Sequence, residues 1–334
     1  VNVLELEEDS NQVSKQSFAH AAGEVWHLCS SPLNADLIST CYNRVLDNKL
    51  SSGCTVWKLL PDSQADSNLC RLEAISSFEP QDEADSVSCF HWRPSSSSAD
   101  KAMLLHGSQI SIIDTDFKSN SMRASAETKV ETKSGNKLTN GKWNPHHNSN
   151  TLAVTCDSTL RGFDIRTMQS AFSIENAHMP VIRDLDFNPN RQYVLATAGD
   201  DCRIKFWDIR QPDKPLGTIG QHSHWVWCIR FNPIHDQLLL SCSSDSRLAL
   251  HCAAALSSEP AGFDDPTDEP ETPTSPALEA LEDGVVRVYD EHEESVYSCD
   301  WAASDPWVFA SLSYDGRLII GRVPKRVKYA ILQL

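Results

Sequence analysis

Histidine, hydroxyl and carboxylate side chains recur together along this sequence of 334 residues. The clearest set is His178, Thr197 and Asp201, followed by Trp207. Two further sets stand at equivalent places: His222, Ser241 and Asp245, then His292, Ser311 and Asp315. These residue types are those of a Ser–His–Asp triad, in which the histidine activates a hydroxyl as a nucleophile.

The repetition of the sets argues against catalysis. An active site needs one triad, whereas this set returns roughly every forty residues, as part of a structural repeat. We interpret each set as a buried hydrogen-bond network in which histidine links the Asp to the Ser or Thr, and the Trp N–H closes the set. His251 and Gly321 stand at the Trp position of the second and third sets, so we expect those networks to be incomplete. We predict no catalytic residue and a protein that is not an enzyme.

Metal and cofactor sites are not indicated either. His146-His147 and His222-x-His224 lack companions at ligand spacing, which favours turn or surface roles. The sequence has no Gly-rich phosphate loop and no nucleophile elbow. Its eleven cysteines include no Cys-x-x-Cys pair, so we expect buried free thiols in a reducing compartment.

The elements that carry each set form a repeated unit. After His178 come an alternating apolar strand, an Asn188-Pro189 turn, a second strand, an Asp turn and a third strand ending at Trp207-Asp208. Six such repeats can be aligned, and radial stacking of the small sheets predicts an all-β propeller spanning residues 1–334. The strand-like segment 1–6 is interpreted as the remnant of another blade. We therefore expect seven blades, with the N-terminal part of the first one missing from this chain; six blades and a stray strand is the alternative.

Two segments do not fit the repeat. Residues 257–284 are acidic and Pro-rich, and we expect a disordered loop within a blade. Within it, Thr272-Pro and Ser275-Pro match the proline-directed phosphorylation pattern; an unmodified acidic spacer is the alternative. Residues 61–68 form a shorter polar loop of the same kind.

Positions three and five after each repeat's histidine are expected near the entrance of the central channel. They hold Trp225 and Trp227 in the fifth repeat, Tyr297 in the sixth, Arg183 in the fourth and, with a slip of one, Trp26 in the first. Trp, Tyr and Arg are enriched at interface hot spots. We predict that these five residues form a partner-binding face; packing of the aromatic rings between blades is the alternative.

Charge restricts the class of partner. The net charge is −17 and the pI about 5.0, which disfavours nucleic acids and anionic membranes. We identify no signal peptide and no apolar run long enough to span a bilayer. We therefore expect a cytoplasmic protein that reaches membranes only through protein partners.

The repeats resemble those of the WD40 family over nearly the whole chain. Segments such as Trp143-Asn-Pro-His-His-Asn148, His222-Ser-His-Trp-Val-Trp227 and Ser311-Leu-Ser-Tyr-Asp-Gly316 go beyond a generic WD repeat. They resemble the EARP- and GARP-complex-interacting proteins, a WD40 family of endosomal recycling. The resemblance implies a non-enzymatic adaptor, a monomeric propeller within a larger assembly that binds the EARP and GARP vesicle-tethering complexes. It further implies endosome-to-Golgi retrograde transport, dense-core vesicle cargo sorting, and a location peripheral to the trans-Golgi network and recycling endosomes.

Two other functions remain open at this stage. Phe163-Asp-Ile-Arg166 and Trp207-Asp-Ile-Arg210 resemble the Trp-Asp-x-Arg pattern with which WD40 substrate receptors of cullin-RING ubiquitin ligases contact their adaptor. Arg166 and Arg210 would make that contact. A receptor for cargo peptides, like the peroxisomal WD40 importer, is the third interpretation.

Overall fold

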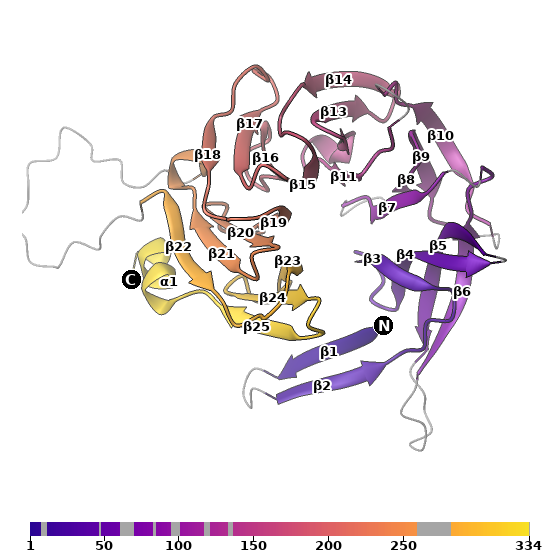
Figure 1. The fold of residues 1–334 in the computed structure, drawn as a ribbon, viewed down its shortest axis with the longest axis horizontal. Coiled ribbons are helices and arrows are strands. Elements are labelled where there is room, and N and C mark those ends of the chain that lie inside the picture. The colour runs from indigo at the N-terminus through magenta and orange to yellow at the C-terminus, as the bar shows by residue number, and fades with distance from the viewer. Residues whose placement is uncertain are drawn as a thin grey trace, which may run out of the picture. The chain divides into compact units, whose positions relative to one another are not determined.

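The fold is seen in a computed structural model (Figure 1). The structure describes residues 1–7, 12–46, 48–60, 70–82, 85–94, 101–116, 121–132, 136–258 and 282–333. The chain divides into two compact units, which are described separately. Unit 1 consists of Val1–Trp143 and Asp164–Gln169, and unit 2 of Asn144–Phe163 and Ser170–Leu334.

Unit 1 contains a hairpin, two four-stranded antiparallel sheets and one further strand. The sheets have the strand orders β3-β4-β5-β6 and β10-β9-β8-β7. The strands are β1 (Asn2–Glu7), β2 (Gln12–Ser17), β3 (Glu24–Ser30), β4 (Leu37–Leu46), β5 (Lys49–Leu60), β6 (Arg71–Phe78), β7 (Val87–Trp92), β8 (Lys101–His106), β9 (Gln109–Asp114), β10 (Ala124–Lys129) and β11 (Asn140–Trp143).

Unit 2 contains three antiparallel sheets, ordered β15-β16-β17-β18, β19-β20-β21-β22 and β23-β24-β25. The strands β12, β13 and β14 are consecutive neighbours in another sheet. The strands are β12 (Thr151–Cys156), β13 (Thr159–Asp164), β14 (Gln169–Ile174), β15 (Ile182–Phe187), β16 (Val194–Gly199), β17 (Ile204–Asp208), β18 (Gly217–Ile219), β19 (Val226–Phe231), β20 (Leu238–Ser243), β21 (Leu248–Cys252), β22 (Gly284–Tyr289), β23 (Val296–Trp301), β24 (Val308–Ser313) and β25 (Leu318–Arg322). Short 3-10 turns cover His147–Ser149 and Ala254–Leu256.

The turn residues explain why the chain reverses where it does. After β15, Asn188 is fully buried, and its side-chain oxygen accepts the backbone N–H groups of Asn190 and Arg191 at 2.8 and 2.7 Å. Asn232 does the same after β19. The proline that follows each asparagine has no backbone N–H to satisfy, so one side chain and one ring fix the turn.

The aspartate turns follow the same logic at the other end of the sheets. Asp201, Asp245 and Asp315 each accept the backbone N–H of the residue two positions on. The residue between adopts a left-handed conformation, and in the last repeat that residue is Gly316, with φ of 77°. This is the backbone region that glycine occupies without steric cost.

The cores of both units are made mainly of side chains from the first and middle strands of the sheets. β8, β16 and β20 are buried almost throughout, since each has a sheet neighbour on both edges. The main cluster of unit 1 consists of Cys41, Cys54, Val56, Val87, Phe90, Trp92, Ala102, Leu104, Ile113 and Met122.

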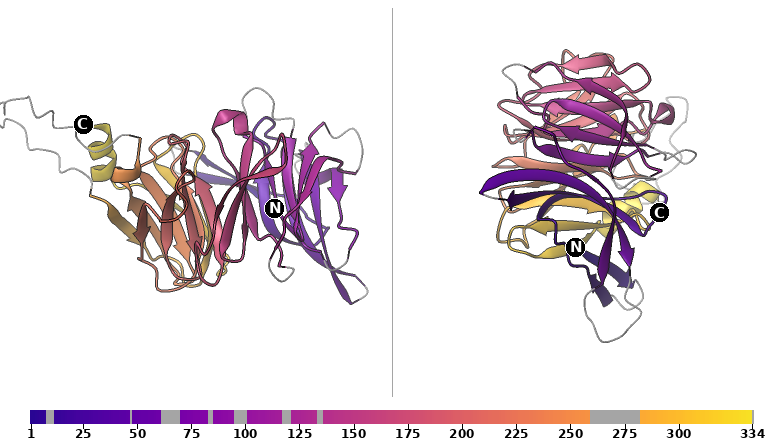
Figure 2. Two further views of the ribbon diagram at one scale, coloured as in Figure 1. Left: turned by 90° about the horizontal axis from the view of Figure 1, so that it is seen from above. Right: turned by 90° about the vertical axis from the view of Figure 1, so that its right-hand side faces the viewer.

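Two elements differ from the sequence-based expectation. The segment 1–6, interpreted from the sequence as the remnant of another blade, pairs as β1 with β2 in a separate two-stranded sheet. The short α-helix α1 (Lys325–Leu332) follows the last strand, and Figure 2 shows it as the coiled ribbon near the C-terminus. Val327 of α1 is buried in the same cluster as Tyr289 of β22.

Residues 259–281, which include Thr272 and Ser275, and residues 61–69 lie outside the described part of the chain. The flanking strands β21 and β22 pair with each other in one sheet. Among the described residues, no helix has the length and apolar character needed to cross a bilayer.

Candidate protein-docking surface

The repeated histidine sets are buried hydrogen-bond networks. His178 Nδ1 lies 2.6 Å from Asp201 Oδ1, and His178 Nε2 lies 2.7 Å from Thr197 Oγ1. Trp207 Nε1 donates to the same hydroxyl at 2.8 Å. Since an ionised carboxylate can only accept, Nδ1 donates to Asp201. Burial alone would raise the pKa of Asp201, but His178 and Lys205 hold it below its usual value.

In the next sheet, a second histidine takes the place of the tryptophan. His222 contacts Asp245 at 3.0 Å and Ser241 at 2.7 Å. Ser241 Oγ also lies 2.7 Å from His251 Nε2, so the set has four members and not the incomplete network expected from the sequence. Burial and the neighbouring His222 lower the pKa of His251 to about 3, which keeps its ring neutral.

The set of the last sheet is the one that lacks a fourth member. His292 Nε2 lies 2.8 Å from Ser311 Oγ, whereas His292 Nδ1 stands 3.5 Å from Asp315. Gly321 stands where Trp207 stands in the complete set, and a Cβ atom there would collide with the ring of Phe309. The aromatic ring of the middle strand therefore occupies the space that a tryptophan would need.

One further set escaped the sequence analysis. In unit 1, His20 Nε2 lies 3.0 Å from Thr40 Oγ1, and Trp57 Nε1 donates to that hydroxyl at 2.8 Å. The twenty-residue separation of His20 and Thr40 is close to the nineteen residues between His178 and Thr197 and would have revealed it. His20 Nδ1 bonds to the carbonyl of Gly23 in place of an aspartate.

The burial of the hydroxyl groups in these sets is incompatible with a role as catalytic nucleophiles. Thr197 and Ser241 are fully buried, and so is His178. A hydroxyl nucleophile must reach the substrate atom that it attacks. The sets therefore act within the sheets, where each satisfied polar group fixes the position of one strand relative to the next.

A β-bulge recurs at one position in the first strand of five sheets. The register skips a single residue between Val25 and His27, Val87 and Cys89, Ile182 and Asp184, Val226 and Cys228, and Val296 and Ser298. The skipped residues are Trp26, Ser88, Arg183, Trp227 and Tyr297. Four of these five were predicted for the partner-binding face. A bulge redirects one side chain out of the sheet pattern, and such bulges are common next to functional sites.

In unit 2, each bulge residue contacts the residue that directly follows the second strand of its own sheet. Arg183 forms a two-bond ion pair with Asp200, at 2.6 and 2.9 Å. Trp227 Nε1 donates to Ser244 Oγ at 2.5 Å. In the last sheet, the rings of Tyr297 and Tyr314 lie 4.7 Å apart. Burial, and then Tyr314, raise the pKa of Tyr297.

The arginine also joins two neighbouring sheets. The Arg183 guanidinium lies 4.5 Å from the ring centre of Trp227 and 5.1 Å from that of Trp225. The two indole rings meet edge to face, with centroids 6.0 Å apart. A guanidinium over an indole is attracted by the negative face of the ring, so these side chains hold one another in fixed positions.

We call the residues Arg183, Trp225, Trp227, Tyr297 and Tyr314 the docking rim. Trp225 is 40% exposed and Tyr314 is 71% exposed, while the other three are half-buried. Tyr314 was not predicted as a site residue. Its position, directly before the Asp315 turn, is equivalent to that of Asp200 and Ser244. The expected alternative, aromatic rings packed between sheets, describes the half-buried Trp227 better than Trp225.

Trp26, the remaining residue of the predicted face, belongs to unit 1. It is 43% exposed, and its ring lies 6.2 Å from that of His27. Its side chain is thus presented to solvent at the bulge of β3.

The two arginines of the alternative ligase pattern are held by their own aspartates. Arg166 is paired with Asp164, and Arg210 with Asp208, each at 2.6 Å. The side chain of Arg210 is 60% exposed, and its guanidinium lies 4.2 Å from the ring centre of Tyr193.

Small antiparallel sheets, repeated His–Ser/Thr–Asp networks and a strand, β17, that ends in Trp207-Asp208 define a WD40-repeat β-propeller protein, with six blade-like sheets among the described residues. Comparison with protein families agrees. The model described as EIPR1 beta-propeller matches residues 1–251, and the WD domain, G-beta repeat model matches residues 283–320.

Full-length relatives point to the same family. The chain is 40% identical to EARP and GARP complex-interacting protein 1 of Rattus norvegicus and to that of Homo sapiens, with 99% of this chain and 89% of each relative covered. It is 35% identical to EARP-interacting protein 1 of Caenorhabditis elegans, over 100% of this chain and 89% of that protein. The chain belongs to the EIPR1 family of WD40 β-propellers, which confirms the resemblance seen in its repeats.

Proposed function

We propose that this protein is a non-enzymatic adaptor that binds the EARP and GARP vesicle-tethering complexes through its docking rim. The names of its relatives support the choice of partner. The observation that carries the choice of surface is the recurrent bulge, which places Arg183, Trp227 and Tyr297 at equivalent positions in three consecutive sheets. The adaptor would serve endosomal recycling, endosome-to-Golgi retrograde transport and dense-core vesicle cargo sorting.

The physical basis of the proposed binding is a rigid, partly apolar surface. Arg183 is fixed by Asp200 and by the two indole rings, so little side-chain entropy would be lost on binding. Trp225 offers its exposed ring as an anchor that a partner could desolvate. Large rigid rings next to an arginine are the composition in which binding energy concentrates.

The test is co-purification of tethering subunits with tagged full-length protein from cells. Trp225→Ala and Trp227→Ala are expected to abolish co-purification while thermal unfolding remains cooperative. Tyr329→Ala is the matched control, because Tyr329 is a 46% exposed aromatic on α1, outside the docking rim. Normal recovery of the subunits with both tryptophan variants would contradict this surface.

The same assay separates the ubiquitin-ligase alternative. In that case a ligase adaptor would co-purify with the wild type and be lost with Arg210→Ala. We propose instead that the wild type recovers tethering subunits and no ligase adaptor, and that Arg210→Ala retains every tethering subunit that the wild type recovers. Because Arg210 is paired within its own turn, its replacement leaves the docking rim in place.

We further propose that the location of the protein follows from its partner. Binding to the tethering complexes would place it at the cytoplasmic side of the trans-Golgi network and recycling endosomes. Within that assembly we propose a single seven-bladed propeller, with β1 belonging to the seventh sheet. Imaging of the Trp225→Ala variant tests the location, which should change to a diffuse one.

A further inference from the structure

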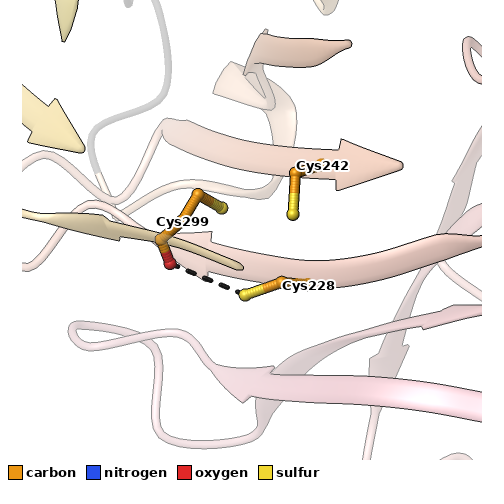
Figure 3. Close-up of side chains that lie close together, drawn as sticks. All are labelled: Cys228, Cys242 and Cys299. Carbon is orange, nitrogen blue, oxygen red and sulfur yellow. Dashed lines mark hydrogen bonds between the residues drawn. The ribbon is translucent and has the colours of Figure 1, made fainter. Parts of the chain in front are cut away.

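Three cysteines from two neighbouring sheets of unit 2 converge in its core (Figure 3). They are Cys228 on β19, Cys242 on β20 and Cys299 on β23. Their Sγ atoms all lie within 4.8 Å of one another. Each side chain is at most 3% exposed, and all three are free thiols. We call these residues the cysteine trio.

The fold, and not the sequence spacing, creates the trio. Cys228 and Cys242 are direct partners across the β19–β20 pair. Cys299 enters from the next sheet, 71 residues from Cys228, whose Sγ lies 3.6 Å from the Cys299 carbonyl oxygen. This explains why the sequence, which has no Cys-x-x-Cys pair, predicts no metal site.

The spacing of the sulfurs is close to that of a three-coordinate metal centre. With metal–sulfur distances of about 2.3 Å, three sulfurs around one ion stand about 4 Å apart. Shifts of less than about 1 Å in side chains would bring the trio to that spacing. Rotation about the Cys side-chain bonds supplies shifts of this size without moving the strands.

The surroundings select the type of ion. The trio lies in an apolar cluster with Leu240, Val296 and Trp301, and Trp227 of the docking rim packs against this cluster. Structural Zn²⁺ takes four ligands, and within the described residues the trio supplies three ligand atoms. Soft thiolate donors favour Cu(I), which is stable with three ligands and needs no water.

Binding releases protons, because the thiolate and not the thiol is the metal ligand. Three protons leave to solvent for each Cu(I) that enters, and one Cu(I) with three thiolates carries a net charge of −2. Burying that charge in an apolar core is costly, so the three metal–sulfur bonds must outweigh this cost. The copper enters and stays as Cu(I), so no electron is transferred.

We propose that Cys228, Cys242 and Cys299 form a binding site for a single Cu(I) ion in the core of unit 2. The ion would join the strands β19, β20 and β23 below the docking rim. This inference is independent of the proposed tethering function, because its readout is metal binding by the purified chain.

The experiment is an anaerobic titration of the reduced full-length protein with Cu(I) against the chromogenic chelator bicinchoninate. We expect one Cu(I) per chain to be withheld from the chelator, and X-ray absorption at the copper edge to show three sulfur neighbours. Because the site is buried, the titration is run both on the native protein and on protein refolded with Cu(I) present.

Cys242→Ser and Cys299→Ala are expected to lose the bound ion. Cys252→Ser is the matched control, because Cys252 is a fully buried free thiol on the neighbouring strand β21, outside the trio. The proposal is overturned if wild-type protein withholds no Cu(I) in either titration. It is equally overturned if the absorption spectrum shows fewer than three sulfurs, or if both folded trio variants bind copper like the Cys252 control.

Discussion

His251 gives this fold a measurable dependence on pH. Its ring is fully buried, it contacts Ser241, and its pKa is lowered to about 3 by burial and by His222. In the unfolded chain its pKa is about 6.5. Between these two values the unfolded chain binds one more proton than the folded chain, so stability falls as pH falls below 6.5.

The size of the effect follows from the pKa difference. One pKa unit corresponds to about 1.4 kcal/mol, so lowering the pH from 7.5 to 5 should cost about 2 kcal/mol through this residue alone. His251→Gln and His251→Trp both remove the titrating ring. Tryptophan is the residue type that stands at the equivalent position, Trp207, in the neighbouring set, where it donates to the hydroxyl. Glutamine is not, so the two variants are expected to differ in stability at pH 7.5.

The assay is urea unfolding at pH 7.5, 6.5, 5.5 and 5, compared between the wild type and the two variants. Acidic groups such as Asp201 and Asp245 have pKa values that are lowered in the fold, so their contribution to the free energy of unfolding falls with acid in all three proteins. That shared contribution cancels when the variants are compared with the wild type. Both variants should therefore be less sensitive to pH by about 2 kcal/mol over this range, whatever their starting stability. Parallel pH profiles for wild type and variants would refute the assignment of a buried neutral ring.

Two substitutions test the packing of the sheets. Trp207→Phe removes the indole donor to Thr197, and we expect a loss of about 1–3 kcal/mol by urea unfolding, because a buried hydroxyl loses one of its partners; a change below about 0.5 kcal/mol would show that this donor is dispensable. Gly321→Ala places a methyl group against Phe309 and should cost about 1–3 kcal/mol. Gly220→Ala, with no atom within 4 Å of the added methyl group, is its control, and equal melting temperatures for the two alanine variants would disprove the collision.

The sequence contained enough information for the fold class and the repeat. The spacing of His178, Thr197, Asp201 and Trp207 recurs because each blade rebuilds the same local hydrogen bonds. The family comparisons confirm the propeller and the family. The helix α1 was not anticipated, because eight residues give too few turns for a helical period to be recognised.

Residue spacing along the chain was a weaker guide where one side chain can replace another in space. His251 completes a network that the sequence predicted to be incomplete. Its Nε2 reaches the Ser241 hydroxyl, just as the Trp207 indole reaches the Thr197 hydroxyl in the neighbouring sheet. Tyr314 joins the docking rim because the Asp315 turn brings it beside Tyr297. Neither contact is visible as a motif.

The sequence by itself determined the repeat, the strand and turn positions, the buried polar sets and the acidic character of the protein, because these depend on residues that are neighbours in the chain or within one sheet. Only the tertiary structure decided that Arg183 lies over Trp225 and Trp227, and that Cys228, Cys242 and Cys299 meet. Those contacts join different sheets, and side-chain packing between sheets depends on how the sheets stack, which no local period of the sequence records.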